Sequence, residues 1–382
     1  MLRNHPILRA SLAVAACATL ALAQSAEFDK ARPKDDKFFP VAVWLQSPHN
    51  AQRYKDIGVN LYVGLYQGPT EQQLKALAKA KMPVICHQNV VGLKDESGTI
   101  VAWMHGDEPD NAQRQKSGGY GPPTPPHEIV KGFEAMRKKD KRAVLLNLGQ
   151  GAAWDGWHGR GNRTNHPEDY PEYVKGCDIV SFDIYPVTHT HKDVKGKLEF
   201  VGRGVQRLRK WSKNQKPVWA CIETGHVDNK NVRPTPDQVE NEVWQAIACG
   251  ADGIIYFAHE FAPKFVEAGL LKHEDVRKRV ANVNKRIASL AHVLNSKQQP
   301  KVVTVTNQPE IPVAIRVHRH RGSNYAFVAS LSDQPHTVHL DVRGQRTGVA
   351  KNLGTGENRR FKGGKITVDL GPYGTAQVHI TR

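Results

Sequence analysis

Short apolar runs alternate with amphipathic segments along the chain from Phe38 onward. The runs are rich in β-branched residues and have the length of strands, whereas the segments between them repeat apolar positions with the period of a helix. Eight strands are predicted, at Phe39–Leu45, Asn60–Tyr66, Pro83–His87, Ile100–His105, Ala143–Leu148, Asp178–Ile184, Pro217–Ile222 and Gly253–Phe257. An alternation of this kind is typical of βα units around a parallel sheet.

Helices are expected between most of these strands, and one has a clear start signal. The sequence Thr235-Pro236-Asp237 supplies an N-cap residue followed by proline at the first helical position. The predicted helices are Gln52–Ile57, Glu71–Ala80, His127–Lys139, Tyr170–Lys175, Leu198–Ser212, Pro236–Cys249 and Glu274–Leu294. The third strand has only a weak connection through Lys94, and a Gly/Pro-rich loop is expected over Gly118–Pro126.

Eight βα units over roughly 260 residues are the size of a (β/α)8 TIM barrel. We predict this α/β fold for residues 36–297. A doubly wound open sheet is the main alternative, but it usually has a glycine-rich G-x-G-x-x-G turn after its first strand. The first strand of this chain is followed by no such turn.

The helical pattern stops near Pro300. Strands are predicted at Val302–Val305, Val313–Val317, Tyr325–Ser330, Thr337–Val342, Lys365–Asp369 and Thr375–Ile380. Strands without intervening helices indicate a small all-β sandwich domain, which we place at residues 300–382. Two roles remain open for it: a carbohydrate-binding module, or a structural domain packed on the barrel, which we favour.

The N-terminus has the pattern of a signal peptide. Arg3 and Arg9 precede the apolar run Leu12–Ala23, which ends in the small-residue site Ala21-Leu22-Ala23. We therefore predict a signal peptide at residues 1–23 and a secreted or periplasmic location. A lipoprotein signal ending at Cys17 is the alternative. The run is short for a bilayer span, and no later segment is long and apolar enough to be a membrane helix.

The remaining cysteines give no sign of a metal site. Cys86, Cys177, Cys221 and Cys249 stand singly in apolar runs, and no C-x-x-C pair occurs. We expect buried free thiols, with one disulfide as the alternative. We also expect no cofactor.

The formal net charge of +17 permits two interpretations. The first is an anionic partner, such as a sulfated or uronic polysaccharide, which Arg160 and Arg163, together with His189, His191 and Lys192, are best placed to contact. The second is an ordinary solvated surface. The sequence contains no nucleic-acid-binding motif, so no nucleic-acid partner is expected. It leaves the oligomeric state open.

The candidate chemistry lies at the ends of the predicted strands, because TIM-barrel enzymes place their working residues there. Glu108 follows the fourth strand and Glu223 follows the seventh. Retaining glycosidases use two carboxyl groups about 5–5.5 Å apart, one protonated and one ionised. Strands 4 and 7 lie across the barrel mouth, so these two glutamates are the predicted pair.

Two segments resemble a known group of enzymes. Trp103-Met104-His105-Gly106-Asp107-Glu108-Pro109 and Trp219-Ala220-Cys221-Ile222-Glu223-Thr224-Gly225 resemble retaining (β/α)8 glycoside hydrolases of the clan A type, whose catalytic glutamates lie on strands 4 and 7. The resemblance covers the barrel and not the C-terminal domain. It implies that Glu108 is the acid/base and Glu223 the nucleophile, and that Tyr185 lies near the nucleophile. The group usually carries Asn where this chain has Asp107.

Further residues at the strand ends and in the loops are candidates for sugar binding. The loop after the fifth strand contains tryptophans, whose rings stack on sugars in glycan sites or else cover the barrel rim. The predicted substrate-binding residues are Asp107, Trp44, His87, Asn147, Trp154, Trp157, Asp183, Tyr185, Tyr256, His259 and Glu260.

Histidines at the strand ends match no metal-ligand spacing, so no metal is expected. These residues are His87, His105, His226 and His259. The sequence therefore favours a secreted retaining glycoside hydrolase acting on an extracellular poly- or oligosaccharide. A non-catalytic glycan-binding barrel is the first alternative, and a metal-dependent barrel deacetylase or phosphodiesterase is the second.

Overall fold

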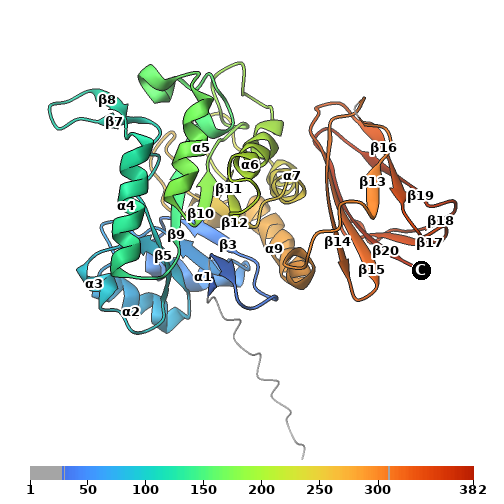
Figure 1. Cartoon of the computed structure of the whole chain (residues 1–382), viewed down its shortest axis with the longest axis horizontal. Coiled ribbons are helices and arrows are strands. Elements are labelled where there is room, and N and C mark those ends of the chain that lie inside the picture. Colours follow the sequence, from blue (N-terminus) through green and yellow to red (C-terminus); the bar gives the residue numbers. More distant parts are fainter. Residues whose placement is uncertain (1–27, 30, 309) are drawn as a thin grey trace, which may run out of the picture.

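A computed structural model describes residues 28–29, 31–308 and 310–382, so the predicted signal peptide lies outside the described residues. Figure 1 shows two units side by side: a barrel surrounded by helices, and an all-β domain formed by the C-terminal part of the chain. Among the described residues, no helix combines the length and apolar character that crossing a bilayer requires.

Eight parallel strands form a closed barrel in the order in which they occur along the chain. The predicted fold class, a TIM barrel followed by an all-β domain, is confirmed. The barrel strands are β3 (Val41–Trp44), β4 (Leu61–Val63), β5 (Val84–His87), β6 (Ile100–Met104), β9 (Val144–Leu148), β10 (Ile179–Phe182), β11 (Val218–Glu223) and β12 (Gly253–Phe257).

The strands are apolar along their whole length because both of their faces are buried. In β11, Ala220 and Ile222 pack towards the helices, whereas Trp219 and Cys221 fill the barrel interior. Cys221 is one of four cysteines in the described chain, and all four are free thiols, as expected. Side-chain alternation therefore decides which residues reach the interior and the mouth.

The helices are α1 (Ala51–Asp56), α2 (Glu71–Ala80), α3 (Val90–Leu93), α4 (Pro126–Lys139), α5 (Tyr170–Tyr173), α6 (Glu199–Trp211), α7 (Pro236–Ala248), α8 (Gly269–Lys272) and α9 (Glu274–Leu294). The start signal of α7 forms a capping box. Thr235 Oγ1 accepts from the backbone N–H of Gln238 at 3.2 Å, and Gln238 Oε1 accepts from the N–H of Thr235 at 2.9 Å. The short helices α3 and α8 were not predicted.

A hairpin stands where the sequence predicts only a loop. Strands β7 (Ala112–Arg114) and β8 (Tyr120–Pro123) pair in antiparallel fashion and project from the barrel (Figure 1). Gly118 and Gly119 have φ angles of +90° and +75°, which only glycine adopts readily, and these angles allow the chain to reverse. At the N-terminal end of the barrel, β1 (Phe28–Asp29) pairs with β2 (Arg32–Pro33).

The C-terminal domain is a sandwich of two antiparallel sheets, in the strand orders β13-β16-β19 and β14-β15-β20-β17-β18. Its strands are β13 (Val303–Val305), β14 (Val313–His320), β15 (Ser323–Ser330), β16 (His336–Val342), β17 (Gly348–Asn352), β18 (Asn358–Phe361), β19 (Lys365–Leu370) and β20 (Thr375–Thr381). Strands β17 and β18 were not predicted, because they are short and carry few large apolar side chains, and β18 lies at the sheet edge.

The sandwich packs on the outer side of the barrel, against α7 and α9 (Figure 1). Trp244 of α7 stacks on Phe327 of β15, with ring centroids 6.0 Å apart. Arg316 of β14 is buried at this interface and donates to the backbone oxygen of Ala251 at 2.6 Å and to Asp252 Oδ1 at 3.0 Å. Buried aromatic and ionic contacts of this kind support a structural role for the domain.

We expect Arg316→Ala to destabilise the protein by about 1–3 kcal/mol, because the Ala251 carbonyl loses this buried donor and Asp252 keeps only Arg209, which lies 3.0 Å from Oδ2. Arg319→Ala is the matched control, because Arg319 lies exposed on the same strand and its replacement costs about 0.5 kcal/mol or less. Urea unfolding of both variants checks this. Equal midpoints would show that the Arg316 contacts do not hold the domains together.

Candidate active site

The loop after β6 presents Glu108 in a strained conformation. Glu108 has a φ of +43°, and this is unfavourable for a residue that precedes proline. Such strain costs about 1–3 kcal/mol and is concentrated at functional sites. The carbonyl oxygen of Glu108 accepts from the backbone N–H of Asn111 and from Gln113 Nε2, both at 3.1 Å. These bonds hold the turn that fixes the position of the Glu108 side chain.

A second carboxyl group, that of Asp183 after β10, forms a hydrogen bond with Glu108. Tyr185 donates its hydroxyl to Asp183 Oδ2 at 3.2 Å. Asp183 Oδ1 is buried, and no N–H or hydroxyl group of the described chain donates to it. Burial, followed by the charge of Glu108, raises the pKa of Asp183 well above its usual range.

Glu108 itself has a pKa suited to proton transfer near neutral pH. Burial raises this pKa to about 7, and the hydrogen bond with Asp183 opposes the rise. Neighbouring carboxylates, Asp107 and Asp110, raise it further. A carboxyl group that is largely protonated at neutral pH is what a general acid requires.

Asp107 lies next to Glu108 and is oriented by the end of β9. Asn147 Nδ2 donates to Asp107 Oδ1 at 2.9 Å, and Ser181 Oγ donates to Asn147 Oδ1 at 2.7 Å. Burial of the Asp107 carboxyl group raises its pKa to about 6. Asp107 and Asn147, both predicted from the sequence, are thus brought together with Glu108 and Asp183 on one side of the barrel mouth.

Asp110 is a residue of this loop that the sequence did not single out. It is fully buried and accepts from the N–H of Gly149 and from the hydroxyl of Tyr170, both at 2.9 Å. These contacts attach the Glu108 loop to the start of the loop after β9. Asp110 therefore positions the Glu108 loop. In the sequence, only its place two residues after Glu108 indicated such a role.

Glu223 is the last residue of β11 and has no exposed surface. Its carboxylate accepts from the backbone N–H groups of Val187 at 2.6 Å and Thr188 at 3.0 Å. Burial raises the pKa of Glu223 to about 7, and these hydrogen bonds oppose the rise. In the structure, the connection between β10 and α6 therefore covers this carboxylate.

A further carboxyl group, that of Glu242 on α7, lies behind Glu223. Glu242 is fully buried, and neither of its oxygens has a hydrogen-bond partner in the described chain. Burial, followed by the charge of Glu223, raises the pKa of Glu242 well above its usual range. The surroundings of Glu242 therefore favour its neutral, protonated form.

The tryptophans of the loop after β9 pack on histidines near the mouth. Trp154 is buried and lies 4.7 Å from the His191 ring and 6.2 Å from the Trp157 ring. Trp157 is half-buried and donates from Nε1 to Asn111 Oδ1 at 2.8 Å. Trp157 is therefore attached to the Glu108 loop. Trp154 packs on Trp157 and supports its position.

A pocket of about 350 Å³ lies at the other side of the mouth, by the ends of β3, β4 and β12. His259 lines it, and His259 Nε2 lies 3.1 Å from Gln46 Nε2. Tyr66 and Phe265 also line it, with exposed fractions of 70% and 61%. Exposed aromatic rings beside a pocket are suited to stacking on sugars. Neither residue was among the predicted binding residues, although Tyr66 ends the second predicted strand and Phe265 lies in an aromatic loop after the eighth.

Two predicted residues at the ends of β3 and β5 are less accessible than expected. Trp44 is 5% exposed and packs among the side chains that fill the barrel interior. His87 is half-buried, and burial lowers its pKa, so its ring is neutral near pH 7. These two residues form the floor of the mouth and not its rim.

Two predictions about individual side chains, those for Tyr256 and Glu260, are wrong. Tyr256 is fully buried and donates to Asn284 Oδ1 on α9 at 2.7 Å, because side-chain alternation in β12 directs it towards the helices. Tyr185 donates its hydroxyl to Asp183, and its place near the nucleophile stays a prediction. Glu260 pairs with His273 Nε2 at 2.5 Å and Lys272 Nζ at 3.1 Å, which removes it from the sugar-binding candidates.

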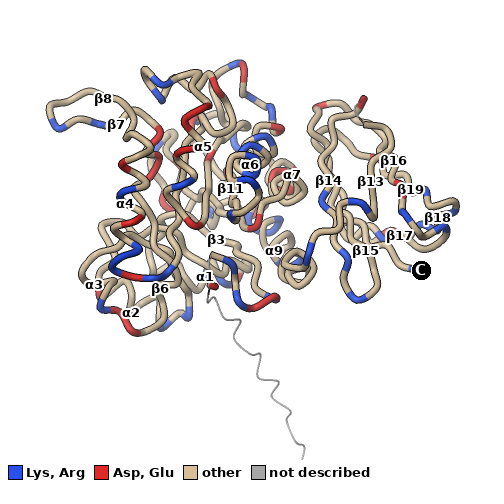
Figure 2. The backbone as a smooth tube through the Cα atoms, in the orientation of Figure 1, with Lys and Arg blue, Asp and Glu red and all other residues tan. Residues whose placement is uncertain are grey.

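The arginines proposed to contact an anionic substrate are engaged elsewhere. Arg160 is 1% exposed and pairs with Asp169 at 2.7 Å, and Arg163 pairs with the same carboxylate. Figure 2 shows Lys and Arg spread over both domains and interspersed with Asp and Glu. The distribution of charge therefore favours an ordinary solvated basic surface.

Comparison with known proteins points to one class of enzyme. Residues 156–293 match the model of the family described as β-galactosidase, glycoside hydrolase family 42. This segment includes Asp183 and Glu223 but not Glu108. No curated protein matches the chain.

Solved structures of similar fold include two glycosidases. One is a family 27 β-L-arabinopyranosidase from Geobacillus stearothermophilus, with 11% identity, a TM-score of 0.51 and coverage of 91% of this chain and 97% of that one. The other is a maltogenic α-amylase from Thermotoga neapolitana, with 9% identity, a TM-score of 0.51 and coverage of 91% and 99%. At these identities the likeness shows the fold alone. Together with the family match, it confirms the resemblance to (β/α)8 glycoside hydrolases and supports glycosidase activity.

Proposed function

We propose that this relative of the (β/α)8 glycoside hydrolases is an exported enzyme that cleaves O-glycosidic bonds with retention of configuration. The observation that carries the proposal is the placement of Glu108 after β6 and Glu223 at the end of β11, each with a pKa raised to about 7. These are strands 4 and 7 of the barrel. Near neutral pH, carboxyl groups with such pKa values exist in both protonated and ionised forms, so that either can take part in proton transfer or act as a carboxylate.

The proposed reaction has two steps. In the first, Glu108 gives its proton to the leaving oxygen while the Glu223 carboxylate attacks the anomeric carbon, so that the glycosidic bond breaks and a glycosyl–enzyme ester forms. In the second, Glu108 takes a proton from water, and the water oxygen attacks the anomeric carbon and releases Glu223. Glu108 therefore ends each turnover in the protonated form in which it began.

Asp183 is assigned to hold a proton against Glu108 and not to attack the sugar. Its carboxyl group is hydrogen-bonded to that of Glu108. Hydrogen-bonded carboxyl groups are closer than the roughly 5–5.5 Å that a retaining pair needs to enclose the scissile bond. Glu223 is buried, and its carboxylate accepts hydrogen bonds from the N–H groups of Val187 and Thr188. The substrate must therefore displace this segment before Glu223 can attack it.

The substrate is proposed to be a poly- or oligosaccharide whose sugar rings stack on Tyr66 and Phe265. The family match makes a β-galactoside the first substrate to test. The net charge of +17 makes an anionic glycan a second class of substrate to test, although the arginines expected to bind it are paired with a carboxylate. Export rests on the signal-peptide pattern of residues 1–23.

Hydrolysis of a panel of aryl glycosides and of neutral and anionic polysaccharides tests the proposal. We expect cleavage, with a first-formed product of the same anomeric configuration as the substrate, observed by proton NMR. Product of opposite configuration would contradict the retaining mechanism. Glycan binding without cleavage of any substrate would support the alternative, a non-catalytic glycan-binding barrel.

A further inference from the structure

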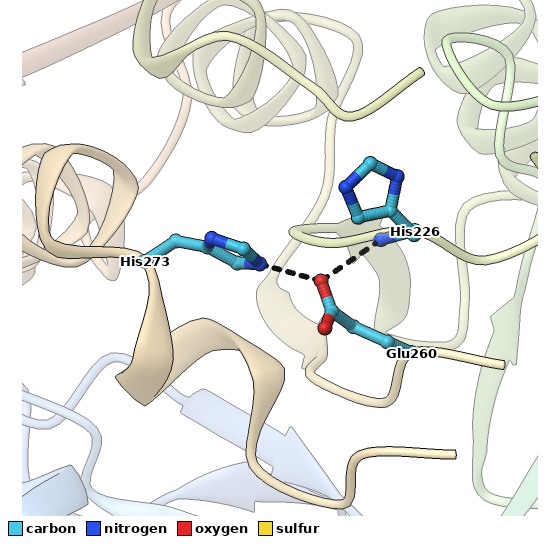
Figure 3. Close-up of side chains that lie close together, drawn as sticks. All are labelled: His226, Glu260 and His273. Atoms are coloured by element: carbon cyan, nitrogen blue, oxygen red, sulfur yellow. Dashed lines mark hydrogen bonds and ion pairs between the residues drawn. The ribbon is translucent and has the colours of Figure 1, made fainter. Parts of the chain in front are cut away.

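Three side chains from separate segments meet beside the barrel mouth. His226 follows β11, Glu260 follows β12, and His273 lies between α8 and α9. Each offers one ligand atom, and these atoms all lie within 4.8 Å of one another. Figure 3 shows the His273 ring directed at the Glu260 carboxylate and the His226 ring on its other side. Two imidazoles and a carboxylate are a donor set that zinc binds.

The Glu260 carboxylate occupies a closely fitted position. It is 1% exposed, and Oε1 lies 2.5 Å from His273 Nε2. A Cβ atom at Gly225 or Gly269 would lie 2.9 Å or 2.6 Å from Glu260 Cγ, closer than real Cβ atoms approach. Glycine at both positions is therefore required for the carboxylate to lie between the loops.

The His226 ring is held in the tautomer that a metal ligand needs. Nδ1 lies 3.1 Å from the carbonyl oxygen of Asn229 and 3.0 Å from that of Val232. Carbonyl oxygens only accept, so the proton is on Nδ1 and the lone pair is on Nε2. Within the described part of the chain, Nε2 has no hydrogen-bond partner. Anchoring of one ring nitrogen by a backbone carbonyl is the usual second contact of metal-binding histidines.

We propose that His226 Nε2, Glu260 Oε1 and His273 Nε2 bind a divalent transition-metal ion of the zinc type. The alternative, a plain ion pair of Glu260 with His273 and Lys272, explains the carboxylate but gives no partner to His226 Nε2. Lys272 Nζ contacts Oε2 at 3.1 Å, which leaves Oε1 as the single carboxylate ligand. Binding displaces the proton from His273 Nε2, and water completes a tetrahedral site.

The ion would tie three segments of the rim together. It would join the loop after β11, which begins directly after Glu223, to the loop after β12 and to the connection between α8 and α9. The role is structural, and the proposal does not depend on the proposed glycosidase activity. Its test therefore measures metal binding and stability and uses no substrate.

The experiment is zinc titration of the mature chain after treatment with a chelator, followed by calorimetry and by metal analysis after gel filtration. We expect about one zinc ion per chain and a rise in the thermal unfolding midpoint when zinc is added. His226→Ala and His273→Ala should each weaken zinc binding at least about tenfold. His127→Ala is the matched control, because this histidine is exposed on α4 and should leave binding unchanged.

A fourth variant separates the metal site from the ion pair without removing a ligand. Lys272→Gln should bind zinc roughly fivefold more tightly, because it removes a unit positive charge a few ångströms from the ion. Binding of no zinc by wild type and by Lys272→Gln would overturn the proposal. Equal binding by wild type and by His226→Ala would also overturn it, because zinc would then lie elsewhere.

Discussion

Glu223→Ala is expected to lower kcat/KM for every glycoside that the wild type cleaves by about 10⁴-fold or more, because it removes the atom that attacks the anomeric carbon. Azide fits the space that the missing carboxylate leaves. Added azide should therefore restore turnover and give a glycosyl azide of configuration opposite to that of the substrate. Initial rates and product NMR with an activated aryl glycoside measure both effects.

The controls for this variant test whether removal of the buried carboxylate unfolds the protein. Alanine leaves the N–H groups of Val187 and Thr188 without their acceptor, which costs about 1–3 kcal/mol per buried group. Thermal unfolding must show that the variant is folded at the assay temperature, and Glu223→Gln, which keeps an acceptor oxygen, should be equally inactive. Glu128→Ala, at an exposed position on α4, should retain full activity. An active Glu223→Ala would refute the nucleophile assignment and make Asp183 the next candidate.

Sequence periodicity was sufficient to predict the barrel because its strands are buried on both faces. In β11, Val218 to Ile222 are all apolar, and such runs are visible without any knowledge of packing. The residues that cap α7 were also recognisable from a few neighbouring positions in the sequence. Strands β17 and β18 were not predictable in this way, because their burial alternates weakly and β17 depends on pairing with β20, which is distant in sequence.

The candidate site was predictable only where position along a strand decides the outcome. Glu108, Asp107 and Asn147 follow directly from their strand ends, and the structure brings them together. Tyr256 and Glu260 also lie at or beyond a strand end, but side-chain alternation and an ion pair removed them from the mouth.

Pairings between loops leave no trace in the sequence. The contact of Asp183 with Glu108, the covering of Glu223 by the Thr188 segment and the meeting of His226 with His273 all join residues tens of positions apart. Only the closure of the barrel makes these residues neighbours.

Glu108→Ala is expected to show a loss that depends on the leaving group. For natural oligosaccharides, whose leaving oxygen needs a proton, kcat should fall about 10²–10⁴-fold, the usual contribution of a general acid. For dinitrophenyl glycosides, whose leaving group departs without a proton, the first step should continue and the intermediate should accumulate. Azide should then give a product with the configuration of the substrate, because it attacks the intermediate formed on Glu223.

The pH dependence supplies a second, independent signature of the same residue. Glu108 must be protonated to act, so activity is lost as pH rises through its pKa of about 7; Glu223 must be ionised, so activity is lost as pH falls through its own value of about 7. The profile of kcat/KM should be a narrow bell near pH 7, whose limbs report the coupled carboxyl groups as a set. Glu108→Gln should abolish the basic limb with an activated substrate, whereas Asp183→Asn, which keeps a hydrogen-bond donor to Glu108, should preserve it. A basic limb that persists in Glu108→Gln would show that another group is the acid, and Asp107, with its pKa raised to about 6, would then be tested first.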